Sequence, residues 1–137
     1  MMDKKLSWVY MTSGSPDEAR ELGKMLLEKN LAACVNVLEG MYSLYRWEGE
    51  IQEDQETVLI AKTRHELVNE LTKAVQSVHS YDCPCIIELP IQGGNPEFLK
   101  WIYSETDKKD TRLSRMRKQY RSRILRKSDI LASSLRH

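Results

Sequence analysis

Three residues of the types that bind soft metal ions in proteins lie close together in the sequence: His79, Cys83 and Cys85. In an extended segment, residues 83 and 85 point to the same side, and Pro84 favours that extended form. Two thiolates and an imidazole suit copper(I) or zinc better than magnesium or calcium. Three ligands are one short of a closed zinc site, so water, Asp82 or a second chain would supply the fourth. Cys85 also opens an apolar segment, which leaves a buried, purely structural role open.

The sequence carries no motif of a known catalytic class. Residues 12–17 lack the lysine and glycine spacing of a phosphate-binding loop. None of the three histidines lies in a nucleophile motif. Residues 57–62 lack the aromatic side chains on which RNA-recognition motifs stack bases, so no specific nucleic acid is expected. We therefore expect a binding protein that is not an enzyme and uses no organic cofactor.

Hydrophobic periodicity and capping residues predict the elements that position these side chains. The alternation over residues 6–12 predicts a strand, and the sequence SPDE at 15–18 predicts a capped helix ending near residue 30. Residues 31–38 and 41–47 predict one strand with a bulge or a bend at Gly40, and residues 50–63 predict its return after a turn at 48–49. The remaining predictions are a helix capped by Thr63 and Glu66 that ends near His79, a strand over 85–89 stopped by Pro90, and a short helix capped by Asn95 and Pro96. This βαββαβ order plus a short C-terminal helix predicts an α+β fold, a ferredoxin-like sandwich of four antiparallel strands with two helices on one face.

The predicted hairpin of residues 31–63 is too long for the domain that carries it. A strand of about 15 residues spans roughly 50 Å, whereas a compact domain of about 105 residues is only roughly 33 Å across. An overhang would expose Tyr42, Leu44, Tyr45 and Trp47 together with open strand edges. We expect these residues to form the interface with other copies of the chain.

Charge is divided unevenly along the chain. Residues 1–106 hold 10 Lys plus Arg against 17 Asp plus Glu, whereas residues 107–137 hold 11 against 3. We expect one domain over 1–106 and a basic tail over 107–137 that forms an amphipathic helix or is disordered. The three cysteines show no disulfide framework, and neither an export signal nor a membrane span is visible, which together indicate a cytoplasmic protein.

Several segments, each at its expected place in this order, resemble the CutA family over about residues 6–105. Residues 31–36 read LAACVN, residues 45–49 read YRWEG, residues 89–91 read LPI, and residues 94–101 read GNPEFLKW. The resemblance implies a homotrimer built like the nitrogen-regulatory PII proteins, with long hairpins that pair between subunits. It also implies a connection with divalent metals, chiefly copper.

The resemblance adds candidate residues and shows two departures. Cys34 matches a family cysteine that could bind metal, but a lone strand cysteine usually behaves as a small buried apolar residue. Lys62 and Arg46 could receive an anionic ligand at a subunit boundary, although charged strand residues are more often solvated or paired. Tyr81 is, with Lys62, a candidate ligand-binding residue. Cys85 replaces the acid that usually follows the second helix in the family, and Met11 stands where some members have a cysteine.

Two hypotheses from different classes therefore stand at this point. One is a homotrimeric divalent-cation tolerance protein that binds copper, zinc or another divalent metal ion in the response to metal ions. The alternative is a metal-independent trimeric scaffold, or a PII-like signalling protein that binds a small molecule or a protein partner.

Overall fold

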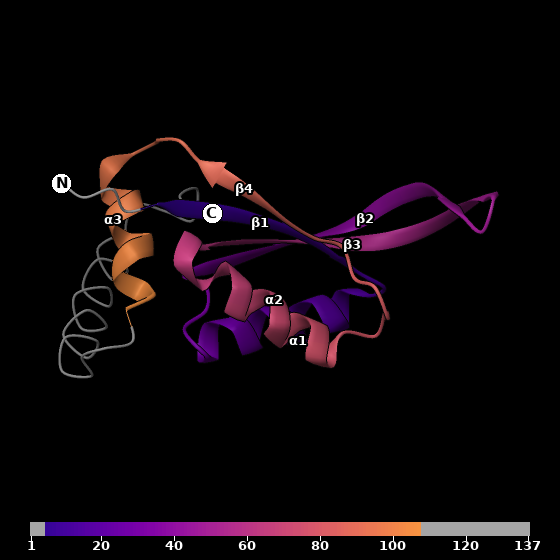
Figure 1. The fold of residues 1–137 in the computed structure, drawn as a ribbon, viewed down its shortest axis with the longest axis horizontal. Coiled ribbons are helices and arrows are strands. Elements are labelled where there is room, and N and C mark those ends of the chain that lie inside the picture. Colours follow the sequence, from indigo (N-terminus) through magenta and orange to yellow (C-terminus); the bar gives the residue numbers. More distant parts are fainter. Residues whose placement is uncertain (1–4, 108–137) are drawn as a thin grey trace, which may run out of the picture. The chain divides into compact units, whose positions relative to one another are not determined.

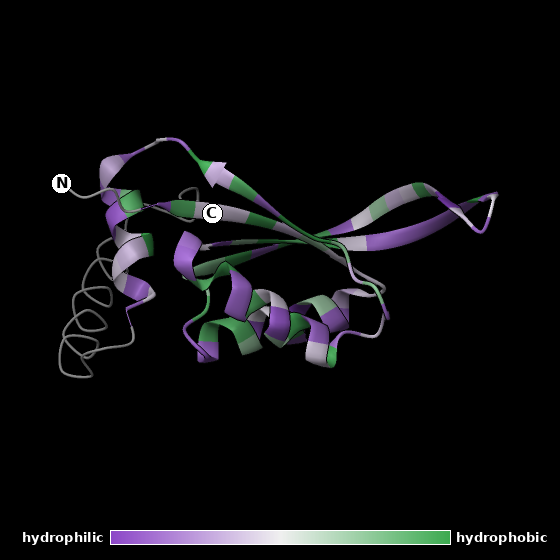
Figure 2. Ribbon diagram, viewed as in Figure 1, coloured by the Kyte–Doolittle hydropathy of each residue, from purple (hydrophilic) through white to green (hydrophobic). Residues whose placement is uncertain are grey.

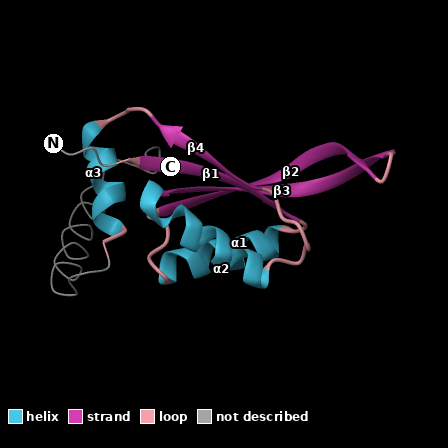
Figure 3. Cartoon of the chain, in the orientation of Figure 1, coloured by secondary structure: helices cyan, strands magenta, loops and turns pink. Residues whose placement is uncertain are grey.

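A computed structural model describes residues 5–107 as four strands and three α-helices. The elements are β1 (Leu6–Ser13), α1 (Pro16–Glu28), β2 (Cys34–Trp47), β3 (Glu50–Arg64), the 3-10 turn η1 (His65–Leu67), α2 (Val68–Val78), β4 (Ile86–Ile91) and α3 (Pro96–Glu105). The strands form one antiparallel sheet in the order β2-β3-β1-β4. This confirms the predicted ferredoxin-like α+β fold (Figures 1 and 3).

Helices α1 and α2 cover one face of the sheet, and alternation along β1 decides which side chains they bury (Figure 1). Val9 and Met11 are fully buried against the helices, together with Leu59 of β3 and Leu71 of α2. Trp8 and Tyr10 lie on the other face, which these two helices leave open. Apolar residues are concentrated in the middle of the sheet and alternate with polar residues along both helices (Figure 2).

Helix α1 begins and ends where the capping residues predict. The Ser15 hydroxyl accepts a hydrogen bond from the Glu18 N–H at 3.1 Å. Asn30 takes a left-handed conformation, with φ of 55°, directly after the last turn. The Glu18 carboxylate in turn accepts a hydrogen bond from the Gly14 N–H, one residue before the Ser15 N–H that such a glutamate usually binds.

Three predicted boundaries are wrong. Strand β2 begins at Cys34 and not at residue 31, because the Leu31 N–H bonds back to the Leu26 carbonyl of α1. Thr63 does not cap a helix, because it lies inside β3 with a buried side chain, and α2 begins only at Val68 after the turn η1. Pro90 does not stop β4, which continues to Ile91. Strand β4 lies at the edge of the sheet, where a proline without an N–H is tolerated.

The β2–β3 hairpin runs far past the rest of the sheet, as its length predicted (Figure 1). The register shifts between Leu38 and Met41, so the expected bulge is present at Gly40, which has φ of 81°. At the tip, Glu48 and Gly49 form a two-residue turn with φ of 52° and 81°. We call residues 41–56 the arm.

The predicted basic tail lies outside the described residues, apart from Asp107. No helix of the described part is long and apolar enough to cross a membrane.

Candidate functional site

His79, the first predicted metal ligand, joins α2 to β1. Its imidazole is 0% exposed, the exposed part of the residue being backbone. Nε2 lies 2.8 Å from the Thr12 carbonyl oxygen, to which it donates as Nε2–H. Nδ1 accepts the Tyr81 N–H at 3.0 Å. Both ring nitrogens are therefore occupied by backbone groups, and His79 could bind a metal ion only if this joint opened.

Glu18, which the sequence reasoning assigned only to helix capping, holds the loop that follows His79. Its carboxylate accepts hydrogen bonds from the Ser80 N–H at 2.8 Å and from the Ser80 hydroxyl at 2.9 Å. Burial alone would raise the pKa of Glu18, but the hydrogen bonds from Ser80 and Gly14 outweigh it and lower the pKa. The loop is thereby fixed to the β1–α1 turn.

Tyr81, a predicted ligand-binding residue, fixes the same loop to the base of the arm. Its hydroxyl donates to Glu56 at 2.9 Å, and Ser43 donates to the other oxygen of that carboxylate at 2.6 Å. Burial and the Glu56 carboxylate raise the pKa of Tyr81 to about 12, so the phenol stays protonated at neutral pH. A Cβ at Gly14 would lie 3.3 Å from the phenol oxygen, so a larger residue there would crowd the ring and require it to shift slightly.

The three cysteines are free thiols in different places. Cys83 is exposed in the loop, and Cys85 is half-buried just before β4. Burial, followed by the charge of Glu56, raises the pKa of the Cys85 thiol. Cys34 begins β2 at the opposite edge of the sheet, three strand spacings or roughly 14 Å across from β4, and it lies in register with Leu89 and not with Cys85. Within residues 5–107 no three His, Cys, Asp or Glu side chains gather into a metal site, so binding by the predicted set stays a prediction.

Cys34 and Lys62 are cross-strand partners on the open face of the sheet. Lys62 Nζ donates to Asn36 Oδ1 at 2.7 Å and lies 3.9 Å from Cys34 Sγ. It also lies 5.7 Å from the centre of the Phe98 ring of α3. Sequence reasoning missed Asn36 and Phe98. The alternation of β2 could have identified Asn36, because residues 34 and 36 share a face, but nothing local to Phe98 indicates where α3 docks.

The four predicted interface residues are exposed on the arm but divide between its two faces. Tyr42 and Leu44, both 66% exposed, share one face with Ile51, which is 69% exposed and was not predicted. Tyr45 and Trp47, 41% and 59% exposed, lie on the other face. The arm thus presents apolar surface on both sides.

The sheet face opposite α1 and α2 is also largely uncovered. Its side chains include Trp8, Tyr10 and Ile60 in the middle of the sheet, all partly exposed. Ile87 and Leu89 of β4 complete the face and are 53% and 43% exposed. We call this surface, together with Cys34, Asn36 and Lys62, the open face.

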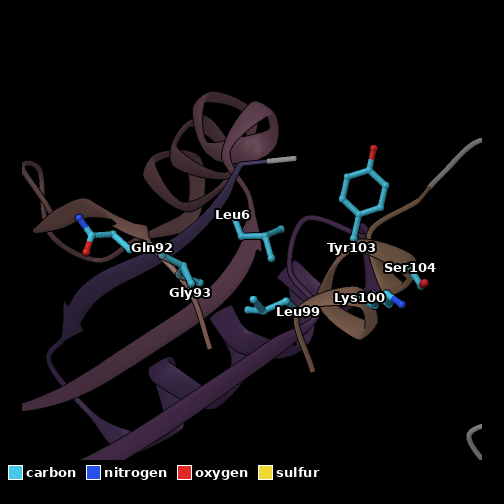
Figure 4. Close-up of a pocket in the computed structure, with 8 residues that line it drawn as sticks. Leu6, Gln92, Gly93, Leu99, Lys100, Tyr103 and Ser104 are labelled. Carbon is cyan, nitrogen blue, oxygen red and sulfur yellow. The ribbon is translucent and has the colours of Figure 1, made fainter. Parts of the chain in front are cut away.

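A separate hollow of about 500 Å³ lies between the start of β1, the β4–α3 loop and α3 (Figure 4). Leu6 and Leu99 point into it, whereas the side chains of Lys100 and Ser104 point away (Figure 4). Because its polar groups do not converge on one point, the hollow selects no ligand chemistry.

These features define a ferredoxin-like domain with an overhanging arm, an open sheet face and no catalytic constellation among the described residues. The family model described as "CutA1 divalent ion tolerance protein" matches residues 7–105. The chain belongs to this CutA family.

Relatives and solved structures agree with this assignment. The chain is 44% identical to the divalent-cation tolerance protein CutA of Thermus thermophilus, over 72% of this chain and 95% of the relative. It is 42% identical to the chloroplastic protein CutA of Arabidopsis thaliana, over 72% of this chain and 54% of the relative. The crystal structure of CutA1 from Oryza sativa superimposes with a TM-score of 0.75 at 40% identity, covering 77% of this chain and 96% of that one. Against the Arabidopsis relative, the chain thus spans only about half of the full length.

Proposed function

We propose that the chain forms a homotrimer that acts in the cytoplasm in the response to divalent metal ions. The observation that carries this proposal is the arm, whose exposed apolar side chains and free strand edge need a partner. The name of the Thermus relative supports the role in divalent-cation tolerance. The chloroplastic name of the Arabidopsis relative leaves the compartment as part of the proposal.

Copper or zinc would be the cargo of such a protein, and the Cys83 and Cys85 thiolates are its best-placed ligands. Both lie on the loop that Glu18 and Tyr81 fix in place, and neither thiol has a hydrogen-bond partner among residues 5–107. The remaining ligands would come from water or from Cys34 of a second copy. Because burial raises the pKa of Cys85, binding must displace its proton, so the affinity should rise with pH.

A pair of variants tests the metal role directly. Protein purified without added metal or affinity tag is analysed for its elements, and its copper(I) and zinc affinities are measured by competition with a chromophoric chelator. Replacing Cys83 and Cys85 by Ser together should lower the affinity at least about ten-fold, because two thiolate ligands are lost. Cys34→Ser, with sedimentation velocity to show the assembly intact, tests the ligand from a second copy, and Glu21→Gln on the exposed side of α1 is the control. An affinity unchanged in the double variant would reject the site.

The alternative is a metal-independent scaffold or PII-like binding protein. The engagement of both His79 ring nitrogens by backbone groups favours it, because one of the predicted metal ligands then serves the fold. Calorimetric titration of the wild-type protein with metal ions separates the two functions. No heat of binding at micromolar concentration would favour the scaffold.

A further inference from the structure

The half-buried side chain of Lys62 has no anionic partner in the described part of the chain. Its ammonium has one short contact, with the amide oxygen of Asn36, and no carboxylate within residues 5–107 lies within ion-pair distance. The Asn36 amide and the Phe98 ring fix Nζ on two sides. A fixed, partly desolvated cation of this kind is expected to pair with an anion, and residues 5–107 of the same chain do not supply one.

The surroundings of Lys62 indicate what brings the missing charge. Lys62 pairs in register with Trp8, and Trp8 pairs with Leu89, so the ammonium lies in a row of apolar side chains on the open face. An exposed apolar face of this kind usually marks a site of interaction with a partner. The partner should therefore combine apolar side chains with a carboxylate.

The arm combines these two features. It carries Tyr42, Leu44 and Ile51 on one face and Tyr45 and Trp47 on the other. Residues 46–56 hold one basic residue, Arg46, and five acidic residues. Two of these acids, Asp54 and Glu56, already accept hydrogen bonds from tyrosines. The other three are exposed and have no hydrogen bond or ion pair with residues 5–107: Glu48, Glu50 and Glu53.

We propose that Lys62, held by Asn36, receives a carboxylate from the arm of a second copy of this chain. The inference rests on the proposed self-association and adds the charge pair that fixes where the arm lies on the open face. Within one chain, the extended β3 carries these acids away from Lys62, so an arm acid can reach such a site only on another copy.

Charge reversal tests the pair. Sedimentation velocity over a dilution series should show that Lys62→Glu raises the dissociation constant about ten-fold or more, since a like charge then meets the arm. Lys62→Met keeps the aliphatic stem and should weaken association less. One of the reversals Glu48→Lys, Glu50→Lys or Glu53→Lys, combined with Lys62→Glu, should restore association. Lys24→Glu, on the exposed side of α1, is the control for net charge and should change nothing.

The outcomes separate this inference from the proposed function. A monomeric wild type would refute the proposed assembly itself. A self-associating wild type whose dissociation constant is unchanged by Lys62→Glu, or is restored by none of the three reversals, would refute the charge pair alone. The acetylation of Lys62 is also compared with and without inorganic phosphate, and in the monomeric and associated states. If phosphate protects Lys62 and self-association does not, the site binds a free anion and the charge pair is refuted. Circular dichroism confirms that each variant is folded.

Discussion

Glu88 joins three elements through one carboxylate oxygen. Oε2 accepts the Ser7 hydroxyl of β1 and lies 2.5 Å from Nδ1 of His65 in η1. Burial alone would raise the pKa of Glu88, but the hydrogen bonds from Ser7 and His65 and the charge on His65 lower it. The edge strand β4 is thereby fastened to β1 and to the turn before α2.

This contact predicts a dependence of stability on pH. A depressed carboxyl pKa stabilises the fold above the pKa of the unfolded chain, about 4.3, and the stabilisation is lost as pH falls through the folded value. Replacing Glu88 with Gln should cost about 0.5 to 1 kcal/mol at pH 7, because solvent screens the partly exposed contact, and the difference from wild type should shrink below about pH 4. Urea unfolding at several pH values measures it, with Glu21→Gln on the exposed side of α1 as control. A difference that stays constant with pH would contradict the account.

Candidate ligands could be predicted from residue type, but their availability could not. The sequence places His79, Cys83 and Cys85 close together. It does not indicate that the Thr12 carbonyl and the Tyr81 N–H occupy the imidazole, because Thr12 lies in a distant part of the chain. Glu18 was interpreted only as a helix-capping residue for a similar reason, since its contact with Ser80 spans 62 residues.

The arm is the element on which the self-association depends. Trp47 is 59% exposed within one chain, so its ring contributes little to the stability of the isolated fold. We expect the Trp47 ring to be buried against another copy of the chain.

Replacing Trp47 with Ala therefore separates folding from assembly. We expect association to weaken by about 2 to 4 kcal/mol, because a large aromatic side chain leaves the interface, with circular dichroism of the folded chain unchanged. A dilution series in sedimentation velocity measures the effect. Leu27→Ala, at a 43% exposed residue of α1, removes apolar surface outside the arm and serves as control. Equal dissociation of the Trp47 variant and the wild type would mean that the ring packs against nothing.

Most elements could be predicted because their signals are local. Ser15 caps α1, Asn95 caps α3, and Gly49 forms the hairpin turn as expected. The boundaries at Thr63 and Pro90 were wrong because tertiary structure overrides local patterns there. Thr63 is held in β3 by its pairing with Ser7, and Pro90 is tolerated because β4 has no further strand beyond it.

At the scale of the whole molecule, family and fold could be predicted from the sequence, whereas the assembly remains a proposal. The motifs that resemble CutA lie within residues 7–105, the part that the family model matches. One chain shows only the surfaces that a partner would cover, namely the arm and the open face. The basic tail of residues 107–137 stays a prediction, because all but its first residue lie outside the described part.

The central claim is that this chain works as a trimer joined by its arms, and the mass of the full-length protein in solution tests it most directly. Sedimentation equilibrium at low micromolar concentration and physiological salt should give about three times the 16.0 kDa of one chain. The same mass should persist after treatment with a metal chelator, because the proposed contacts use apolar surface and charge. A mass of one chain under these conditions would contradict the account.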